Sequence, residues 1–358
     1  MAEKKKATID DVAREARVAK GTVSRVIGNR PHVAPSTRKL VLDAMRKVGY
    51  RPNYFAQNAL AKRSRTLVLA ISEYVENLLS YDHLFNSIVY ELNRVCHDYK
   101  YMLSLAVLKK GPGGCASLPG YLKERFIEGI FILGHMEPAC IDAVRGFSKN
   151  IVSIEAPGIV HELSSVTPDY FRVGHISAGH LVNLGHKRIA ITTVTETQMA
   201  SVAERIRGVE VCMSQAGLGI PAEYRLVYDA HLPASFPGRD IVERVLSMKI
   251  RPTGIIFMGD NIAIAAIHHF QARNIDVPGD ISIVGYGNHD VASHCIPRLT
   301  TVEVNTQHIC YESFNLLKEM IDKPDYHRTR GIRRISLSVD LIERDSTATP
   351  PAERTEKG

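Results

Sequence analysis

The stretch KGTVSRVI, residues 20–27, places basic and hydroxyl side chains at the spacing of one short helix. Its three β-branched apolar residues would share the inward face, because residues three and four positions apart lie on one side of a helix. The outward positions are then Lys20, Gly21, Thr22, Ser24 and Arg25. An arginine can bind guanine through two hydrogen bonds, and a lysine can reach a base or a phosphate. Hydroxyl groups suit phosphate contacts, which fix register rather than sequence. This set of side chains predicts a helix that reads DNA.

Three short helices are expected to position these side chains. TIDDVAREA (8–16) begins at Thr8, which can cap it, and its early aspartates favour the positive end of the helix dipole. The connection RVA is tight and leads to the helix at 20–27. A third helix opens at Ser36, ends at Gly49 and is expected to bury Leu40, Val41, Ala44, Met45 and Val48. Two short helices joined by a tight turn in a basic three-helix unit indicate a helix-turn-helix.

Charge separates the head, residues 1–65, from the remainder. The head holds 16 Lys or Arg and 5 Asp or Glu, whereas residues 66–358 hold 29 and 33. A basic head on a mildly acidic body indicates that the head binds a polyanion. No apolar run approaches the ~18 residues of a membrane span, and MAEKKKATIDD lacks an apolar signal core, so we expect a cytoplasmic protein without a membrane partner. The six scattered cysteines fit reduced thiols better than disulfides or zinc.

From Leu67 onward, short β-rich runs alternate with amphipathic helical stretches, which implies parallel sheets with helices on both faces. About 280 residues exceed one sheet of this kind, so two α/β lobes are predicted. Ligands of such sheets bind at the carboxyl ends of the strands, here between the lobes. The predicted strands are 67–72, 101–108, 129–134, 151–156, 188–194, 254–259 and 281–286, and the helical stretches are 84–98, 171–184, 201–216, 238–248 and 261–273.

The head resembles that of the LacI-type repressor family from Thr8 to Asn53, and the resemblance continues through HLVNLGHKRIAI (180–191), VPGDISIVGY (277–286) and PRLTTVEV (297–304). It implies a homodimer that binds a near-palindromic operator, controlled by a small-molecule effector. It also implies a periplasmic-binding-protein-like α/β core of two lobes joined by three crossover strands. The expected domains are a DNA-binding domain (1–52), a hinge helix and linker (53–65), the two-lobed effector-binding and dimerisation core (66–345) and a disordered tail (346–358).

The resemblance extends the DNA-binding set and also shows departures from the family. Thr8, His32 and Asn53 are added to the set, with His32 at a loop contact to the DNA backbone. Residues 52–66 match a hinge that becomes helical over the DNA minor groove, where the family inserts a leucine. That position holds Ala59, and Leu60 comes one residue later, so either could be the wedge. Arg17 stands where the family has glycine, and Ala19 replaces its capping serine.

The resemblance also assigns the effector site. Arg205 matches an arginine that holds the ligand, Ser201 a polar contact and Glu155 an acceptor for hydroxyl groups. Ser72 ends the first core strand and faces the cleft, and Asn288 follows VGY, where the family usually places aspartate. Because acids are missing here, we expect a sugar acid, a sugar phosphate or another anionic ligand held by Arg205.

Other classes of function have less support. The chain contains no GxSxG elbow, no HExxH and no phosphate-binding loop, so neither an enzyme nor a metal or cofactor site is predicted. A transport-type sugar-binding protein shares the expected core, but it would lack a basic head. Within regulation, a protein co-effector or partial activation stays an open alternative.

Overall fold

The computed structural model describes residues 7–27, 33–50, 64–79, 83–108, 110–111, 114–115, 127–134, 136–155, 163–194, 200–229, 233 and 235–352. Two compact units divide the chain, Met1–Arg65 and Thr66–Gly358, which are the head and the core. In the described part of the chain, no helix combines the length and the apolar character needed to cross a bilayer.

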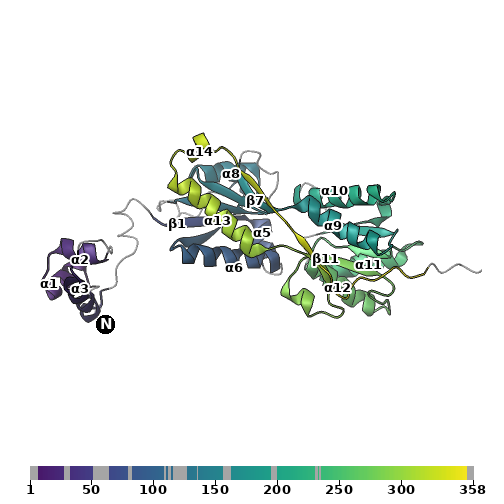
Figure 1. Ribbon diagram of the computed structural model, residues 1–358, viewed down its shortest axis with the longest axis horizontal. Coiled ribbons are helices and arrows are strands. Elements are labelled where there is room, and N and C mark those ends of the chain that lie inside the picture. Colours follow the sequence, from purple (N-terminus) through teal and green to yellow (C-terminus); the bar gives the residue numbers. More distant parts are fainter. Residues whose placement is uncertain are drawn as a thin grey trace, which may run out of the picture. The chain divides into compact units, whose positions relative to one another are not determined.

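The head consists of α1 (Ile9–Ala16), α2 (Lys20–Ile27) and α3 (Pro35–Val48) (Figure 1). Thr8 caps α1 as predicted: its hydroxyl accepts the backbone N–H of Asp11 at 3.3 Å, and the Asp11 carboxylate accepts the N–H of Thr8 at 2.9 Å. Arg17 ends α1 with φ 51°, so it adopts the left-handed conformation that glycine would adopt at lower cost.

A small apolar core holds the three helices of the head together. Its buried members are Val12, Ala16, Val23, Val26, Val41 and Ala44. The prediction that α3 buries Leu40 is wrong, since this side chain is 51% exposed. Val41 and Ala44 are buried as predicted, and Met45 and Val48 are partly buried against them, so the face of α3 that meets the other helices is narrower than the apolar stripe in its sequence.

Lobe 1 of the core is a six-stranded sheet in the order β13-β7-β6-β5-β1-β2, in which all neighbours are parallel. Its strands are β1 (Thr66–Ser72), β2 (Met102–Leu108), β5 (Gly129–Leu133), β6 (Ile151–Ile154), β7 (Ser164–Pro168) and β13 (Arg334–Leu337). Its helices are α5 (Glu73–Leu78), α6 (His83–Asp98), α8 (Pro138–Arg145), α13 (Thr306–Asp322) and α14 (Tyr326–Thr329). A short hairpin joins β3 (Lys110–Gly111) to β4 (Gly114–Cys115).

Lobe 2 has a second sheet in the order β14-β12-β11-β10-β8-β9, in which only the β12–β14 pair is antiparallel. Its strands are β8 (Ile189–Val194), β9 (Arg225–Tyr228), β10 (Gly254–Ile256), β11 (Ser282–Gly287), β12 (Thr300–Glu303) and β14 (Asp340–Ile342). The helical segments are α9 (Tyr170–Asn183), α10 (Ala200–Gln215), η1 (Ala222–Tyr224), α11 (Ser235–Ser247), α12 (Asp260–Gln271) and η2 (Asp290–Ser293).

The chain crosses between the lobes three times, after β7, after β12 and after β13. The last crossing is the extended yellow segment that links β13 to β14 (Figure 1). The two-lobed α/β core with parallel sheets and three crossings is therefore confirmed. Because the chain passes back and forth, each lobe contains segments that are far apart in the sequence.

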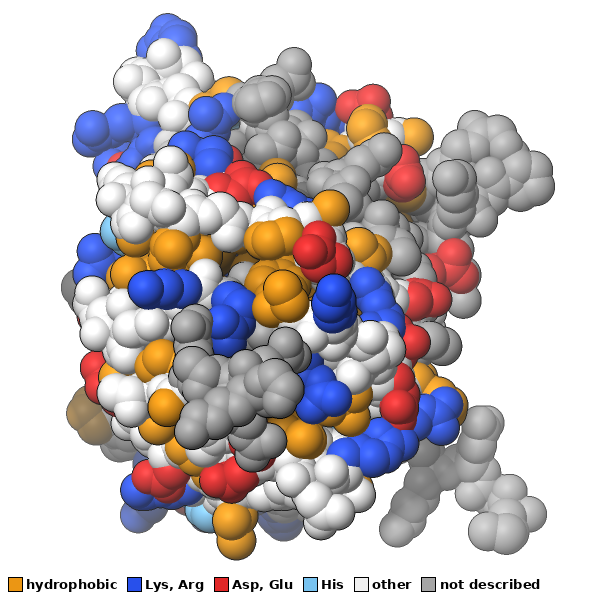
Figure 2. All heavy atoms as spheres, turned by 90° about the vertical axis from the view of Figure 1, so that its right-hand side faces the viewer, with side chains coloured by type: hydrophobic (Ala, Val, Ile, Leu, Met, Phe, Trp, Pro, Cys, Tyr) orange, Lys and Arg blue, Asp and Glu red, His pale blue; other side chains and the backbone are white. Residues whose placement is uncertain are grey.

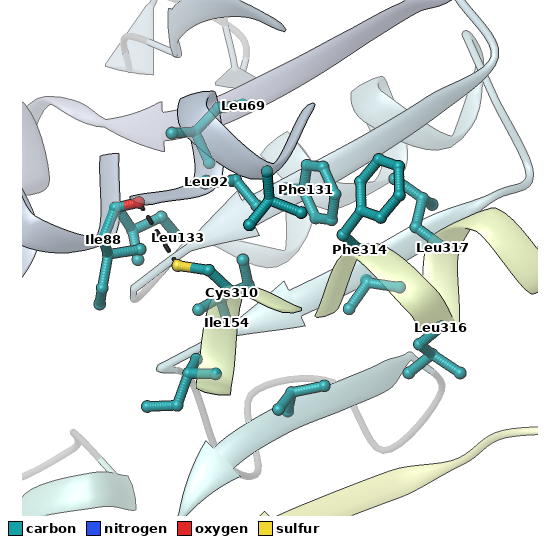
Figure 3. Packing of buried hydrophobic residues seen from close by; sticks show 14 of the residues in the cluster. Leu69, Ile88, Leu92, Phe131, Leu133, Ile154, Cys310, Phe314, Leu316 and Leu317 are labelled. Atoms are coloured by element: carbon teal, nitrogen blue, oxygen red, sulfur yellow. Dashed lines mark hydrogen bonds between the residues drawn. The ribbon is translucent and has the colours of Figure 1, made fainter. Parts of the chain in front are cut away.

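Helix α13 illustrates this, and the sequence patterns did not identify it. It returns to lobe 1 from the second crossing and buries Phe314, Leu316 and Leu317 in the core, where Phe314 and Leu317 lie beside Phe131 of β5 (Figure 3). Cys310 donates from its thiol to the carbonyl oxygen of Ile88 at 3.5 Å, which joins α13 to α6. These side chains are nearly all fully buried, so α13 is a main part of the lobe 1 core.

Helices α9 and α10 of lobe 2 pack backbone to backbone. A Cβ at Gly174 would lie 2.8 Å from the carbonyl carbon of Arg205, and one at Gly208 would lie 2.8 Å from the nitrogen of His175. Real Cβ atoms do not approach so closely, so the crossing requires glycine at both positions. The backbone of Arg205 therefore rests directly on α9.

Two expectations about the core require correction. The tail predicted to be disordered from residue 346 is ordered at its start. Ser346 is fully buried, and its hydroxyl accepts the N–H of Thr300 at 2.9 Å. The carbonyl oxygen of Ala348 accepts from His186 at 2.9 Å, because residues 345–348 lie against β11 and β12. Reduced cysteines were expected throughout, but Cys140 is disulfide-bonded, while Cys96, Cys212, Cys295 and Cys310 are free and buried.

Candidate functional sites

The outward face of α2 is the candidate DNA-binding site. Val23 and Val26 are buried, which fixes the rotation of the helix in the head. The opposite side presents Lys20, Gly21, Ser24 and Arg25 as exposed residues and Thr22 as half-buried. The predicted inward and outward sets therefore match the observed burial.

The two predicted base readers differ in their surroundings. The Lys20 ammonium forms an ion pair with Asp10 at 2.9 Å, with both side chains more than half exposed. An exposed pair of this kind contributes ~0–1 kcal/mol, so DNA can displace it. Arg25 takes part in none of the ion pairs formed among the described residues, and its charge is available to a partner. A Cβ at Gly21 would meet no atom within 4 Å, which leaves an open path to the helix backbone.

Of the other residues predicted to bind DNA, the structure describes only Thr8. The Thr8 hydroxyl donates to Asp11 at 2.7 Å and also caps α1, so its main role in the free protein is structural. His32, Asn53, Ala59 and Leu60 lie outside the described residues, as does the hinge apart from its last two residues. The choice between Ala59 and Leu60 as wedge stays a prediction.

In the core, Arg205 and Glu155 come together around two tyrosines from different segments. Arg205 is 7% exposed, and its guanidinium carbon lies 4.4 Å from the centre of the Tyr286 ring and 5.9 Å from that of Tyr170. The arginine donates from Nη1 to the Met258 carbonyl at 2.9 Å and from Nε to the Ser201 carbonyl at 3.3 Å. These contacts hold the guanidinium in one place.

Glu155 completes this cluster from lobe 1. It follows β6 with φ 57° and is 8% exposed, and its carboxylate accepts a hydrogen bond from the Tyr170 hydroxyl. Burial, reinforced by the nearby charge of Glu155, raises the pKa of Tyr170 well above its usual value. The tyrosine is therefore a neutral donor at physiological pH. A cation, a carboxylate and two aromatic rings at the carboxyl ends of both sheets suit a polar ligand with apolar faces.

The other predicted effector residues have separate contacts. The Ser72 hydroxyl caps α5 by accepting the N–H of Val75 at 3.4 Å, and Ser201 meets Arg205 through its carbonyl oxygen. Asn288 donates to Glu303 at 2.9 Å and accepts from Arg344 at 2.6 Å. Both ends of its amide are thus bonded within the protein, and its role in effector binding stays a prediction.

Asn288 also lines a pocket of 380 Å³ formed by both lobes. His83 and Ser87 reach it from α6, Gly287 to Asp290 reach it from the end of β11, and the second crossing closes it. The His83 and His289 rings are 5.7 Å apart at their centres, so this pocket lies where α6 of lobe 1 approaches lobe 2. Neither histidine was singled out from the sequence, because nothing in the sequence pairs them.

Asp260, the first residue of α12, connects the strands next to this pocket. It is fully buried, and it accepts from the Thr301 hydroxyl at 2.6 Å and from the backbone N–H of His289 at 2.9 Å. Burial raises its pKa to about 6, although these hydrogen bonds oppose the shift. Only the fold shows that Asp260 supports the turn at Asn288, through the backbone N–H of His289 and the hydroxyl of Thr301.

We expect the pH dependence of stability to change when Asp260 is replaced by asparagine. The folded-state pKa exceeds the unfolded value, so the acid contributes stability below about pH 4 and loses it as pH rises through about 6. Between pH 4 and pH 8, the free energy of unfolding of Asp260→Asn should therefore rise by up to about 3 kcal/mol relative to that of the wild type. Urea unfolding at both values measures this difference. His180 and His186, whose pKa values are lowered mainly by burial, titrate in both proteins and cancel. If the unfolding free energies of the two proteins changed in parallel with pH, the raised pKa of Asp260 would be contradicted.

Comparisons with known proteins identify both parts of the chain. Residues 8–53 match the family described as bacterial regulatory proteins, lacI family, and residues 178–347 match a periplasmic binding protein-like domain. Catabolite control protein A of Priestia megaterium is 28% identical over 317 residues, which cover 88% of this chain and 93% of that protein.

Two solved structures match nearly the whole chain. A complex of the transcriptional regulator CelR with cellobiose is 25% identical, with a TM-score of 0.66 and coverage of 95% of this chain and 100% of the other. The Lac repressor dimer bound to operator and the anti-inducer ONPF is 22% identical, with a TM-score of 0.81 and coverage of 96% and 100%. At that identity the second structure supports the fold alone.

Proposed function

Because this chain belongs to the lacI family of bacterial regulatory proteins, we propose that it is a DNA-binding transcriptional repressor controlled by a small molecule. The observation that carries this proposal is α2, which presents an unpaired Arg25 and other polar residues from a basic three-helix head. A two-fold homodimer would place two such helices on a near-palindromic operator. A regulator of bacterial DNA acts in the cytoplasm, and no catalytic role is proposed.

Selection of bound duplexes from a random pool tests the DNA-binding proposal. The full-length protein should recover a near-palindromic sequence, and binding to it should weaken steeply with salt as cations of the head displace counterions. Failure to recover any specific sequence at any salt concentration would overturn the proposal.

We propose that the effector binds between the lobes at Arg205 and Glu155. Arg205 belongs to lobe 2 and Glu155 to lobe 1, so a ligand that contacts both changes the relative free energy of open and closed lobes. The hinge would carry this change to the head. A protein co-effector remains the alternative, and a panel of small molecules that leaves the melting temperature unchanged would favour it.

The arrangement favours a neutral sugar over the anion expected from the sequence. The buried Glu155 carboxylate would repel an anion, whereas it can accept hydrogen bonds from hydroxyl groups. Sugar rings also pack their apolar faces against aromatic rings such as that of Tyr286. In support, one similar structure is a cellobiose complex.

A thermal-shift panel should distinguish these ligand classes. We expect neutral sugars to raise the melting temperature and Glu155→Gln to weaken the active sugar about tenfold, because one charged acceptor is lost. Glu223→Gln, at an exposed position in η1, is the matched control and should bind normally. Stabilisation only by sugar acids or phosphates, with tighter binding in Glu155→Gln, would reverse the assignment.

A further inference from the structure

The edge of lobe 1 at which its strands begin concentrates basic residues that the proposed function does not use. We call it the basic edge; it consists of Arg145, Lys149, Lys323, Arg328, Arg330, Arg333 and Arg334. Two come from the end of α8 and the loop after it, four come from the segment between α13 and β13, and Arg334 is the first residue of β13. All are exposed except Arg145, which is half-buried.

Hydrogen bonds show that these segments share an edge with the first residue of the core. The carbonyl oxygen of Thr66, where β1 begins, accepts the N–H of Glu128 at 3.0 Å. The carbonyl oxygen of Glu128 accepts from the Asn150 side chain at 2.9 Å. Further along, the Ser164 hydroxyl accepts the N–H of Arg333 at 3.0 Å. Thr66 follows the last residue of the head, so the basic edge lies on the side of lobe 1 where the head is attached.

The basic edge is strongly positive on a core whose sequence is net negative. The segment 323–334 contains five Lys or Arg and one acid, whereas residues 66–358 contain 29 basic and 33 acidic residues. Glu319 pairs with Lys323 at 2.7 Å and with Arg333 at 2.9 Å, and Asp142 pairs with Arg145 at 3.3 Å. Lys149, Arg328 and Arg330 form no ion pair with any described residue. A cluster with uncompensated cations attracts a polyanion.

The basic edge is held in place rather than carried on a loose loop. Tyr326 is fully buried and anchors α14, so Arg328 and Arg330 leave a fixed turn. The ring of His327 contacts the Asn150 side chain at 3.2 Å, and Lys149 donates to the Pro324 carbonyl at 3.4 Å. A pocket of 320 Å³ separates the two segments and is lined by Arg145, Lys149 and His327. The cations are therefore preorganised, which lowers the entropic cost of binding.

The far end of the core offers a contrast. The face at the right of Figure 1 intersperses basic and acidic side chains with hydrophobic ones (Figure 2). Arginines of lobe 2 pair with acids, for example Arg225 with Glu210 at 2.5 Å and Arg298 with Asp345 at 2.6 Å. Such a mixed surface carries no comparable attraction for a polyanion.

We propose that the basic edge is a second DNA-contacting surface, which binds phosphates of the duplex flanking the operator. The proposal rests on the DNA-binding function proposed above. DNA held by the head stays at a high effective concentration near the attachment side of lobe 1, so weak phosphate contacts there are sufficient. These contacts extend the footprint and the affinity without adding base specificity.

Two duplexes and two variants test the proposal with the full-length protein. One duplex contains only the operator recovered by selection, and the other extends it by about ten base pairs on each side. Wild type should bind the longer duplex at least about tenfold more tightly at low salt, with a steeper salt dependence. Arg328→Gln/Arg330→Gln should bind the short duplex like wild type but lose this advantage. With two subunits and about 0.9 counterions per contact, its salt slope on the longer duplex should fall by about three to four.

The control is Lys187→Gln/Lys249→Gln, which removes the same charge from exposed positions of lobe 2 and should keep the advantage of the long duplex. If wild type binds the two duplexes equally, or if the Arg328/Arg330 variant keeps the advantage, the basic edge does not contact DNA and an acidic protein becomes its better partner. If wild type binds neither duplex, the DNA-binding function itself fails, which is a distinguishable result.

Discussion

Replacing Arg25 with alanine is expected to weaken binding to the selected operator by at least about thirtyfold. A bidentate arginine–guanine contact contributes ~1–3 kcal/mol, and a dimer would lose two of them. The side chain is exposed and forms no described ion pair, so the stability of the head should barely change. Titration of operator and scrambled duplexes, with unfolding measured in parallel, checks both expectations.

The scrambled duplex decides what Arg25 contacts. If Arg25 reads a base, the loss should be confined to the operator, whereas an equal loss on both duplexes would assign the residue to a phosphate. Arg14→Ala is the matched control, because this arginine is 80% exposed on α1 and, among the described residues, its one ion pair is with Asp11 in its own helix. Its effect should be small on both duplexes.

Gly174→Ala is expected to destabilise the core by at least about 3 kcal/mol and to abolish the effector response. Its methyl group would enter the backbone of Arg205, so α9 and α10 must separate. Overpacking usually costs ~1–3 kcal/mol, and here the neighbour is rigid helical backbone rather than a flexible side chain. Because α10 carries Arg205, the same shift displaces the guanidinium from Tyr286 and Met258. Urea unfolding and the sugar thermal shift measure the two effects.

Gly179→Ala, in the same helix, provides the control. Its methyl group would lie 3.7 Å from the sulfur of Cys212, which is ordinary contact. Alanine stabilises a helix interior by up to ~1 kcal/mol relative to glycine, so this variant should be as stable as wild type or more stable. If both variants lost similar stability, the close approach of α9 and α10 at Gly174 would not be the cause of the loss. The gain in helix propensity at Gly179 would then also be smaller than assumed.

Local signals were sufficient to predict most elements of this protein. The Thr8 capping box, the helix at 20–27 and the glycine that ends α3 each depend on residues within one or two turns. The strands of the parallel sheets are continuous apolar runs, so their positions in lobe 2 were predicted to within about one residue at β8 and β11. Helix α13 was not identified although its sequence is amphipathic, because its cysteine, serine and asparagine positions interrupt the apolar pattern.

The sequence by itself determined the positions of the three head helices and of most of the buried parallel strands, where the charge lies and which side chains of α2 face outward, since these depend on short-range spacing. Only the tertiary structure decided how Arg205 is held by Met258 and Tyr286, how Asn288 is bound by Glu303 and Arg344, and how residues 145–149 meet residues 323–334. The physical reason is that three crossings interleave the two lobes. Contacts across 15 to about 190 residues then depend on packing of the whole core, and no local pattern records them.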